Sequence, residues 1–248
     1  MIFFPEKAFY EEPEQYGFRW QDVFVETSDQ VKIHGWFLQA GNEKGVILFL
    51  HGNAGNISGR LFKAKGWVDR GISVLLIDYR SYGKSEGEIK HGEDIVRDAE
   101  AAYQWLVQEK KTLPEDIIFY GESLGSYPAI RLASEKKAAA LILEAPYTSF
   151  VELGSVHYGL IPEFMRNMLV RDFSFPNREE IPSVKVPIFM MHGTADQVCP
   201  YKMGEELFKL APQPKSFFSV PGGGHNDLPM IADEDYWEKP YRFVNRYL

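Results

Sequence analysis

The sequence predicts an α/β fold in which helices cover both faces of a mostly parallel sheet. Short β-branched or aromatic runs alternate with longer segments of helical period, as in βαβ units. Several of the short runs are continuously apolar, as expected of strands that are covered on both faces. The chain has 248 residues, of which 45% are hydrophobic and 25% charged, and these values fit one globular domain over residues 1–248.

Each expected element follows from this alternation. Residues 22–28 and 31–39 predict an opening hairpin with Asp29 and Gln30 in its turn. Core strands are expected at 45–50, 72–77, 116–120, 140–143, 186–191 and 215–220. Helices are expected near 58–70, 92–110, 124–137, 201–211 and 233–247, and right-handed crossovers would place them on both faces of the sheet.

The interval from about 147 to 184 interrupts this rhythm. It has no clear core strand and is rich in large apolar residues, among them Phe164 and Met168. A connection of this length usually has a function or structure of its own. We expect a small helical cap in which Phe164 and Met168 bind the substrate, and the alternative is a long loop packed on the body of the domain.

Composition restricts partners and cofactors. The net charge of −8 and the pI of about 5.3 argue against a nucleic-acid partner. Cys199 is the single cysteine, and the sequence contains no apolar run of the roughly 18–20 residues that span a bilayer. We therefore expect a cytoplasmic protein without stable membrane insertion. No metal is expected, because the sequence lacks the H-E-x-x-H motif and paired Cys/His ligand spacings. The oligomeric state is left open.

The candidate nucleophile is Ser123, in the G-x-S-x-G motif of residues 121–125. A strand-like run precedes this motif and a helical pattern follows it, which is the strand–turn–helix setting of a nucleophile elbow. Flanking glycines let the neighbouring backbone pass closely, and the new helix presents its positive end to developing negative charge. The alternative is a plain strand-to-helix turn built from small residues.

The candidate base is His225, which follows three glycines after the last expected strand, and the candidate acid is Asp196. A carboxylate on the second ring nitrogen would fix the tautomer of the histidine and stabilise the imidazolium. The order Ser123, Asp196, His225 is that of the α/β-hydrolase fold. Glu144 and Asp227 remain as competing acids, although Asp227 is too near His225 in sequence to pair well.

The oxyanion of an acyl-transfer reaction requires preorganised backbone N–H donors. One should come from Leu124, which follows the nucleophile, and the other from Asn53, with Ala54 as the second choice. His51 should shape this loop by hydrogen bonding. These groups predict a serine hydrolase of small-molecule carboxylic esters or thioesters that needs no cofactor. A peptidase or amidase on the same triad and a non-catalytic ligand-binding protein are the alternatives.

These motifs resemble those of single-domain α/β-hydrolases of the bud-emergence (Bem) type, which are related to the hydrolases that act as protein depalmitoylases. The resemblance covers nearly the whole chain and is carried by HGNAGN at 51–56, DYRSYGKSEG at 78–87, GESLGS at 121–126, LEAPYTS at 143–149, HGTAD at 192–196 and PGGGHND at 221–227. It implies an eight-stranded sheet that is antiparallel at its start, a small cap, and a triad on Ser123, Asp196 and His225. Ser81 departs from the family, which usually has glycine there, and many relatives carry an N-terminal membrane helix.

Overall fold

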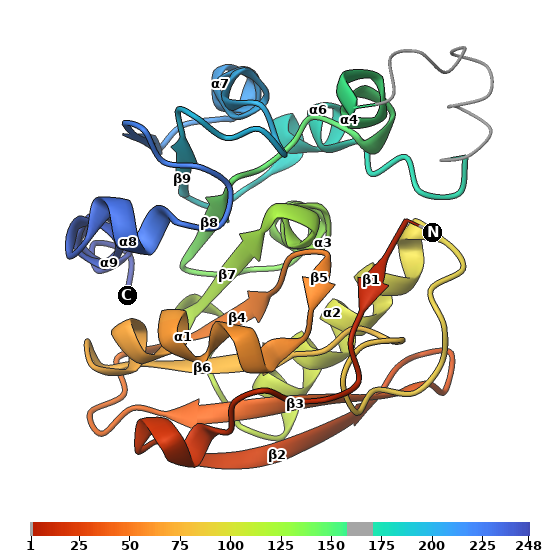
Figure 1. The fold of residues 1–248 in the computed structure, drawn as a ribbon. Coiled ribbons are helices and arrows are strands. Elements are labelled where there is room, and N and C mark those ends of the chain that lie inside the picture. Colours follow the sequence, from red (N-terminus) through yellow and green to blue (C-terminus); the bar gives the residue numbers. More distant parts are fainter. Residues whose placement is uncertain (1, 158–170) are drawn as a thin grey trace.

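An eight-stranded sheet runs through the middle of the protein (Figure 1). The computed structural model describes residues 2–157 and 171–248. Along the sheet the strands lie in the order β10-β9-β8-β7-β4-β6-β3-β2. Their bounds are β2 Arg19–Glu26, β3 Lys32–Gln39, β4 Gly45–Leu50, β6 Ile72–Ile77, β7 Ile117–Glu122, β8 Ala140–Glu144, β9 Ile188–Gly193 and β10 Lys215–Val220.

The sheet is parallel except at its start, as the sequence predicts. Strands β2 and β3 form the expected antiparallel hairpin, and β3 is also antiparallel to β6. From β6 to β10 all neighbouring strands are parallel. The hairpin begins at Arg19 instead of residue 22, and its turn includes Gln30 with a φ of 63°. The carboxyl ends of β4, β7, β8, β9 and β10 therefore meet at one edge.

Helices cover both faces of the sheet and seal two apolar cores. Residues of α2, α3 and α7 belong to the core on one face, and residues of α1, α8 and α9 to the core on the other. The bounds are α1 Leu61–Val68, α2 Gly92–Gln108, α3 Ser126–Glu135, α7 Tyr201–Leu210, α8 Leu228–Ala232 and α9 Asp235–Val244. These observations confirm the predicted architecture of a mostly parallel sheet between two helical layers.

Two helical predictions need correction in detail. The helix expected near 233–247 is present as the shorter α9, and α8, which was not expected, precedes it across Asp233 with a φ of +49°. The helix expected over 58–70 begins with a 3₁₀ turn, η2 Ile57–Arg60, before α1. The five residues of α8 are too few for a periodic pattern, and an apolar period does not distinguish a 3₁₀ turn from the α-helix that continues it.

A second, two-stranded sheet is not foreseen from the sequence. Strand β1 (Phe4–Pro5) pairs in parallel with β5 (Ala54–Gly55), which belongs to the loop after β4 (Figure 1). Strands of two residues leave no periodic pattern, so only the folded chain brings them together. The N-terminal segment thus lies against the loop in which an oxyanion donor is expected.

The described part of the expected cap comprises α4 (Phe150–His157), the stretch from residue 171, α6 (Asn177–Glu180) and η5 (Ile181–Ser183). Phe164 and Met168 lie outside the described residues. Among the described residues, no helix is both long and apolar enough to span a membrane.

Leu75 offers a test of the core that positions the strands. It is fully buried in β6, and replacing a buried leucine by alanine typically costs about 2–5 kcal/mol. We expect Leu75→Ala to lower the free energy of unfolding by about this amount in urea titrations. Leu113→Ala is the matched control, since Leu113 is 58% exposed and should change the free energy by no more than about 0.5 kcal/mol. Equal effects of the two changes would contradict this assignment of the core.

Candidate active site

Ser123 lies in a strained turn between β7 and α3. The turn, η4 (Ser123–Gly125), gives Ser123 a φ of +50°, which non-glycine residues rarely adopt. A Cβ on Gly121 would lie 2.6 Å from the carbonyl oxygen of Gly125, and one on Gly125 would lie 1.9 Å from that of Leu50. Both glycines are therefore required by the close approach of backbone around the serine.

His225 comes to Ser123 from the loop after β10. Its Nε2 lies 3.0 Å from Ser123 Oγ, a hydrogen-bonding distance across 102 residues of sequence. The loop is shaped from within, because Gly224 N–H donates to Asp227 Oδ1 at 2.6 Å. Asp227 is thus bonded to the backbone beside it, whereas the Nδ1 of His225 meets a different carboxylate.

That carboxylate is Asp196, in the turn after β9. Its Oδ2 lies 2.8 Å from His225 Nδ1, and its Oδ1 accepts from the N–H groups of Val198 and Cys199, both at 2.8 Å. Burial by itself would raise the pKa of Asp196. Hydrogen bonds from His192 and His225 and from the Cys199 N–H outweigh burial and hold the pKa below its usual range. The carboxylate therefore stays ionised beside the imidazole.

Sequence reasoning overlooked His192, a second histidine on the same carboxylate. Its ring is fully buried, with Nε2 3.2 Å from Asp196 Oδ2 and 2.8 Å from the carbonyl oxygen of Cys199. A Cβ on Gly204 would lie 2.3 Å from Nδ1, so α7 packs directly on the ring. The H-G-T-A-D motif contains this histidine, but nothing in its spacing indicates that it faces the acid.

Glu144, the competing acid, is engaged elsewhere. Its Oε1 accepts from Lys63 Nζ at 2.9 Å, and its Oε2 accepts from the hydroxyls of Tyr120 at 2.6 Å and Tyr236 at 2.8 Å. The side chain is fully buried among these donors. Glu144 thus satisfies buried hydrogen-bond donors under the sheet edge, while the ring of His225 is bonded to Asp196.

The loop after β4 lies beside the nucleophile, as a source of an oxyanion donor should. A Cβ on Gly52 would lie 3.5 Å from the Cβ of Ser123. Leu124 follows Ser123 directly and is buried. His51 contacts the loop, since its Nδ1 lies 2.7 Å from the carbonyl oxygen of Gly52. The assignment of the Asn53 and Leu124 N–H groups as oxyanion donors stays a prediction.

The side chain of Asn53 makes hydrogen bonds to residues outside its own loop. Its Oδ1 accepts from Phe4 N–H at 3.3 Å and from the Tyr82 hydroxyl at 3.0 Å, and its Nδ2 donates to the carbonyl of Ile2 at 2.8 Å. Tyr82 also donates to the Asn53 carbonyl at 2.6 Å. The N-terminal segment and Tyr82 thus fix Asn53 from two sides, leaving its backbone N–H as the group with a proposed chemical role.

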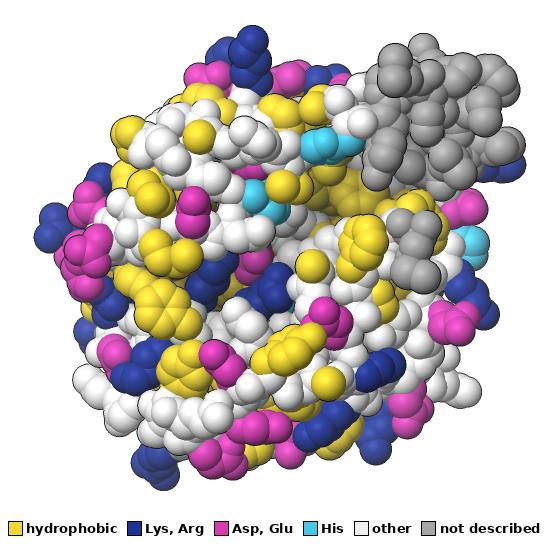
Figure 2. Space-filling model, in the orientation of Figure 1, with side chains coloured by type: hydrophobic (Ala, Val, Ile, Leu, Met, Phe, Trp, Pro, Cys, Tyr) yellow, Lys and Arg dark blue, Asp and Glu magenta, His cyan; other side chains and the backbone are white. Residues whose placement is uncertain are grey.

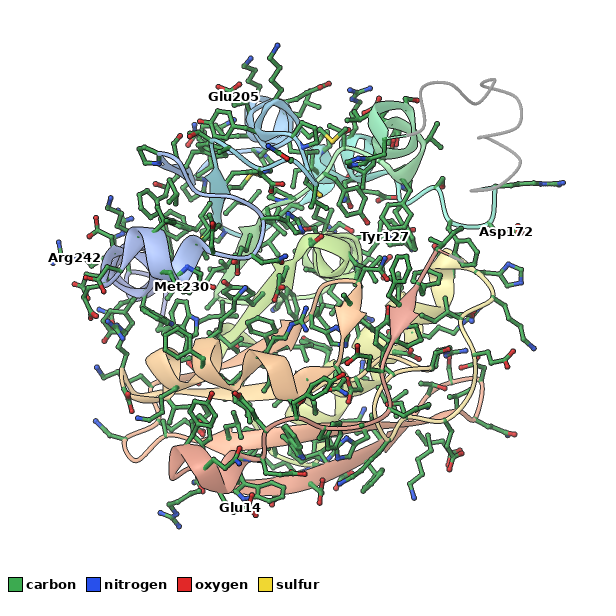
Figure 3. All side chains as sticks on the ribbon, viewed as in Figure 1. Glu14, Tyr127, Asp172, Glu205, Met230 and Arg242 are labelled. Atoms are coloured by element: carbon green, nitrogen blue, oxygen red, sulfur yellow. The ribbon has the colours of Figure 1, made fainter. Side chains whose placement is uncertain are left out.

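Aromatic side chains join the N-terminal segment to the described part of the cap. The ring centroids of Phe3 and Phe173 lie 5.1 Å apart. The ring centroid of Phe175 lies 4.6 Å from that of Phe150 and 5.0 Å from that of Tyr127. Tyr127, the second residue of α3, is labelled in Figure 3 on the side of this helix toward the N-terminal segment. This aromatic cluster joins α3, which follows the nucleophile turn, to the described part of the cap.

Within residues 2–157 and 171–248, no group of three or more His, Cys, Asp or Glu side chains is arranged to hold a metal ion. Cys199 is buried against Ser123 and Asp196, and burial raises the pKa of its thiol well above the usual value. The arrangement as a whole is a buried serine whose hydroxyl is hydrogen-bonded to a histidine, which is in turn bonded to a carboxylate.

Comparison with known proteins gives the family. Residues 41–181 match the model of the family described as "Serine aminopeptidase, S33". An uncharacterized protein of Mycobacterium tuberculosis strain H37Rv is 36% identical over 226 residues, which cover 90% of this chain and 79% of that protein. Alpha/beta hydrolase domain-containing protein 17B of Homo sapiens is 30% identical over 240 residues, 94% of this chain and 80% of that protein.

Solved structures agree on the fold. The esterase Pf2001 of Pyrococcus furiosus superposes with a TM-score of 0.80 at 21% identity, over 98% of this chain and 99% of that one. An esterase of Exiguobacterium antarcticum superposes with a TM-score of 0.69 at 19% identity, over 90% of this chain and 99% of that one. Both have the α/β-hydrolase fold predicted from the nucleophile motif and the order of the candidate triad.

The depressed pKa of Asp196 predicts a pH dependence of stability. A carboxylate with a folded-state pKa below its ordinary value of about 3.9 stabilises the fold above that pH, and the contribution is lost as pH falls. We expect Asp196→Asn to lower the free energy of unfolding at pH 5. At pH 3.5 the difference in this free energy between parent and variant, the gap, should be smaller by roughly 0.7 kcal/mol. Urea titrations at these two pH values, both below the ordinary histidine pKa, measure the gap. A constant or widening gap would contradict the argument.

Proposed function

Because this chain belongs to the α/β-hydrolase family described as serine aminopeptidase S33, we propose that it is a serine hydrolase that cleaves carboxylic ester or thioester bonds through an acyl-enzyme. The family makes the protein a hydrolase. One observation carries the finer proposal, the continuous hydrogen-bonded chain from Ser123 Oγ through His225 to Asp196, with contacts of 3.0 and 2.8 Å. This chain supports nucleophilic catalysis by Ser123.

In the proposed first step, Ser123 Oγ attacks the carbonyl carbon of the substrate as His225 Nε2 takes its proton. Asp196 holds Nδ1–H of the ring and stabilises the imidazolium that forms. The N–H groups of Asn53 and Leu124 would bind the oxyanion, each contributing on the order of 3 kcal/mol to the barrier. His225 then gives its proton to the leaving alcohol or thiol as the tetrahedral intermediate collapses.

In the second step, His225 removes a proton from water, which attacks the acyl-enzyme. The acid leaves, and the proton returns to Ser123 Oγ. The sequence and the bonding scheme require no cofactor for either step. We propose a small-molecule acyl substrate whose acyl part is bound by the cap insertion of about 147–184, with Phe164 and Met168 as the contacting residues. The thioester part of this proposal rests on the resemblance of the motifs to those of Bem-type hydrolases, which are related to protein depalmitoylases.

A peptidase or amidase is the second candidate, because the matching family is described as a serine aminopeptidase. It would use the same serine, histidine and aspartate, with an amine as the leaving group. A panel of acyl esters, acyl thioesters and aminoacyl anilides therefore separates the two candidates. Turnover of anilides in preference to esters would favour the peptidase.

We expect a fluorophosphonate probe to label the purified protein and Ser123→Ala to abolish both labelling and ester turnover. The probe reacts with a serine only when a base removes its proton. Ser126→Ala is the matched control, since Ser126 is a buried serine in the same turn region with no contact to His225 among the described hydrogen bonds. In-gel fluorescence and ester hydrolysis measure the outcome.

Labelling that survives Ser123→Ala would show that the nucleophile is misassigned. A parent protein that neither labels nor turns over any member of the panel would favour the non-catalytic ligand-binding alternative.

Asp196→Asn and Glu144→Gln should differ widely in their effect on turnover. Asn at 196 would leave His225 without an ionised partner and with the wrong tautomer, and we expect kcat to fall by something like 10⁴-fold. Glu144→Gln removes a charge that is bonded to Lys63, Tyr120 and Tyr236, so it should lower stability more than kcat. Steady-state kinetics and urea titrations on the two variants give the comparison. The reverse order of effects on kcat would make Glu144 the acid.

A further inference from the structure

Arg60 joins the two elements that should supply the oxyanion donors. It ends the 3₁₀ turn η2, and its Nη1 donates to the carbonyl oxygens of Ala54 at 2.9 Å and Asn56 at 3.3 Å, both in the loop that contains Asn53. On its other side, Nη2 and Nε donate to the two carboxylate oxygens of Glu122 at 3.3 and 3.4 Å. One planar guanidinium thus connects the loop after β4 to the residue that precedes Ser123.

The connection lies directly beside the nucleophile. A Cβ on Gly52 would lie 3.2 Å from Glu122 Oε1, 3.4 Å from Arg60 Nη2 and 3.5 Å from the Cβ of Ser123. The absence of a side chain at Gly52 therefore lets the ion pair and the serine approach the same small volume. Figure 2 shows basic and acidic side chains gathered in the hollowed middle of the viewed face.

The charge beside Ser123 needs to be neutralised if an oxyanion is to form there. Burial alone would raise the pKa of Glu122, but the charges of Arg60 and Lys63 outweigh burial and keep this carboxyl ionised. Lys63 Nζ lies 3.4 Å from Glu122 Oε2 and 2.9 Å from Glu144 Oε1. Together with Arg60, these side chains form a cluster of two positive and two negative charges. Without Arg60, this group would carry one uncompensated negative charge next to the nascent oxyanion.

We propose that Arg60 is a positioning residue for the oxyanion hole, which holds the Asn53 loop at a fixed distance from the nucleophile turn and neutralises Glu122; the inference rests on the proposed hydrolase function. A displacement of about 1 Å in such donors can cost 10²-fold in rate. Arginine suits this task because its rigid fork presents N–H groups to a carboxylate and to two carbonyls at once.

A purely structural role would predict something different. In that case loss of Arg60 would lower stability and the fraction of active protein, while the molecules that remain folded would turn over substrate at the normal rate. A positioning role lowers kcat for each active site, with little change in KM, because the interaction matters most in the transition state.

The experiment compares Arg60→Met with Arg70→Met. Arg70 is the matched control: its side chain is 16% exposed against 13% for Arg60, it donates to the Gly66 carbonyl at 2.8 Å, and it pairs with Glu234. Arg70→Met therefore also removes one contact to a carbonyl and one to a carboxylate, although Glu234 is exposed and Glu122 is buried, and Arg70 makes no hydrogen bond to the loop after β4 among the described residues. Active sites are counted by fluorophosphonate labelling, and kcat and KM are measured on p-nitrophenyl butyrate.

We expect Arg60→Met to lower kcat per labelled site by about 10- to 100-fold with KM changed by less than about threefold, and Arg70→Met to change kcat by less than about twofold. Methylguanidinium in the buffer should restore part of the lost kcat in Arg60→Ala and leave Arg70→Ala unchanged. Adding Glu122→Gln to Arg60→Met should recover part of the rate, since it removes the uncompensated charge.

Arg60→Lys keeps the experiment decisive if the methionine variant does not fold. Lysine retains the charge but not the fork, so kcat should lie between those of the parent and the other variants, with normal stability in urea. A kcat per labelled site within twofold of the parent in both Arg60→Met and Arg60→Lys would overturn the inference, as would a loss that Arg70→Met reproduces. If the parent itself neither labels nor turns over the ester, the proposed function fails first, and the two failures remain distinguishable.

Discussion

The parallel pairing of β4 with β7 is the constraint on which the site depends. Because these strands are neighbours in the sheet, the loop after one and the turn after the other leave the same edge together. The approach is so close that Gly125 has no room for a Cβ against the carbonyl oxygen of Leu50. Ser123 can then face the Asn53 loop, and its unusual φ is held by packing on both sides. The histidine and aspartate loops, which follow β10 and β9, complete the arrangement from the same edge.

Beneath this edge lies a layer of buried charge that a hydrophobic core would not require. Replacing buried ion pairs by apolar residues is often neutral or stabilising, so a network of Arg60, Lys63, Glu122 and Glu144 is weak evidence for a contribution to stability. Its hydroxyl partners, Tyr120 and Tyr236, satisfy the remaining lone pairs of Glu144. The network is better explained by the arrangement that it holds in place. Breaking a buried ion pair is costly, so the four side chains keep the loop after β4 and the nucleophile turn in one geometry.

Sequence reasoning predicted the parts of this molecule that repeat a period or a motif. Continuous apolar runs located the core strands to within a few residues, and the G-x-S-x-G motif located the turn of Ser123. It preferred Asp196 to Glu144 from the order of the motifs along the chain, and only the folded structure shows that their bonding partners differ. It overlooked Arg60, whose contact with Glu122 joins residues 62 positions apart, and it overlooked His192, because a spacing of four residues does not show that the ring faces Asp196. The resemblance indicated that residue 81 is usually glycine, and the structure supplies a physical reason, since Ser81 adopts a φ of 76°, which favours glycine.

The N-terminal segment shows how far such contacts extend from the chemistry. Phe4 and Pro5 add a strand to the loop after β4, and the side chain of Asn53 bridges the backbone on either side of Phe3. Phe3 in turn packs on Phe173 of the cap region. The proposed oxyanion loop is therefore held from one side by Arg60 and from the other by a short segment that also contacts the region proposed to bind the acyl group. Direct contacts through Phe3 and its neighbours thus join the loop after β4 to the described part of the cap.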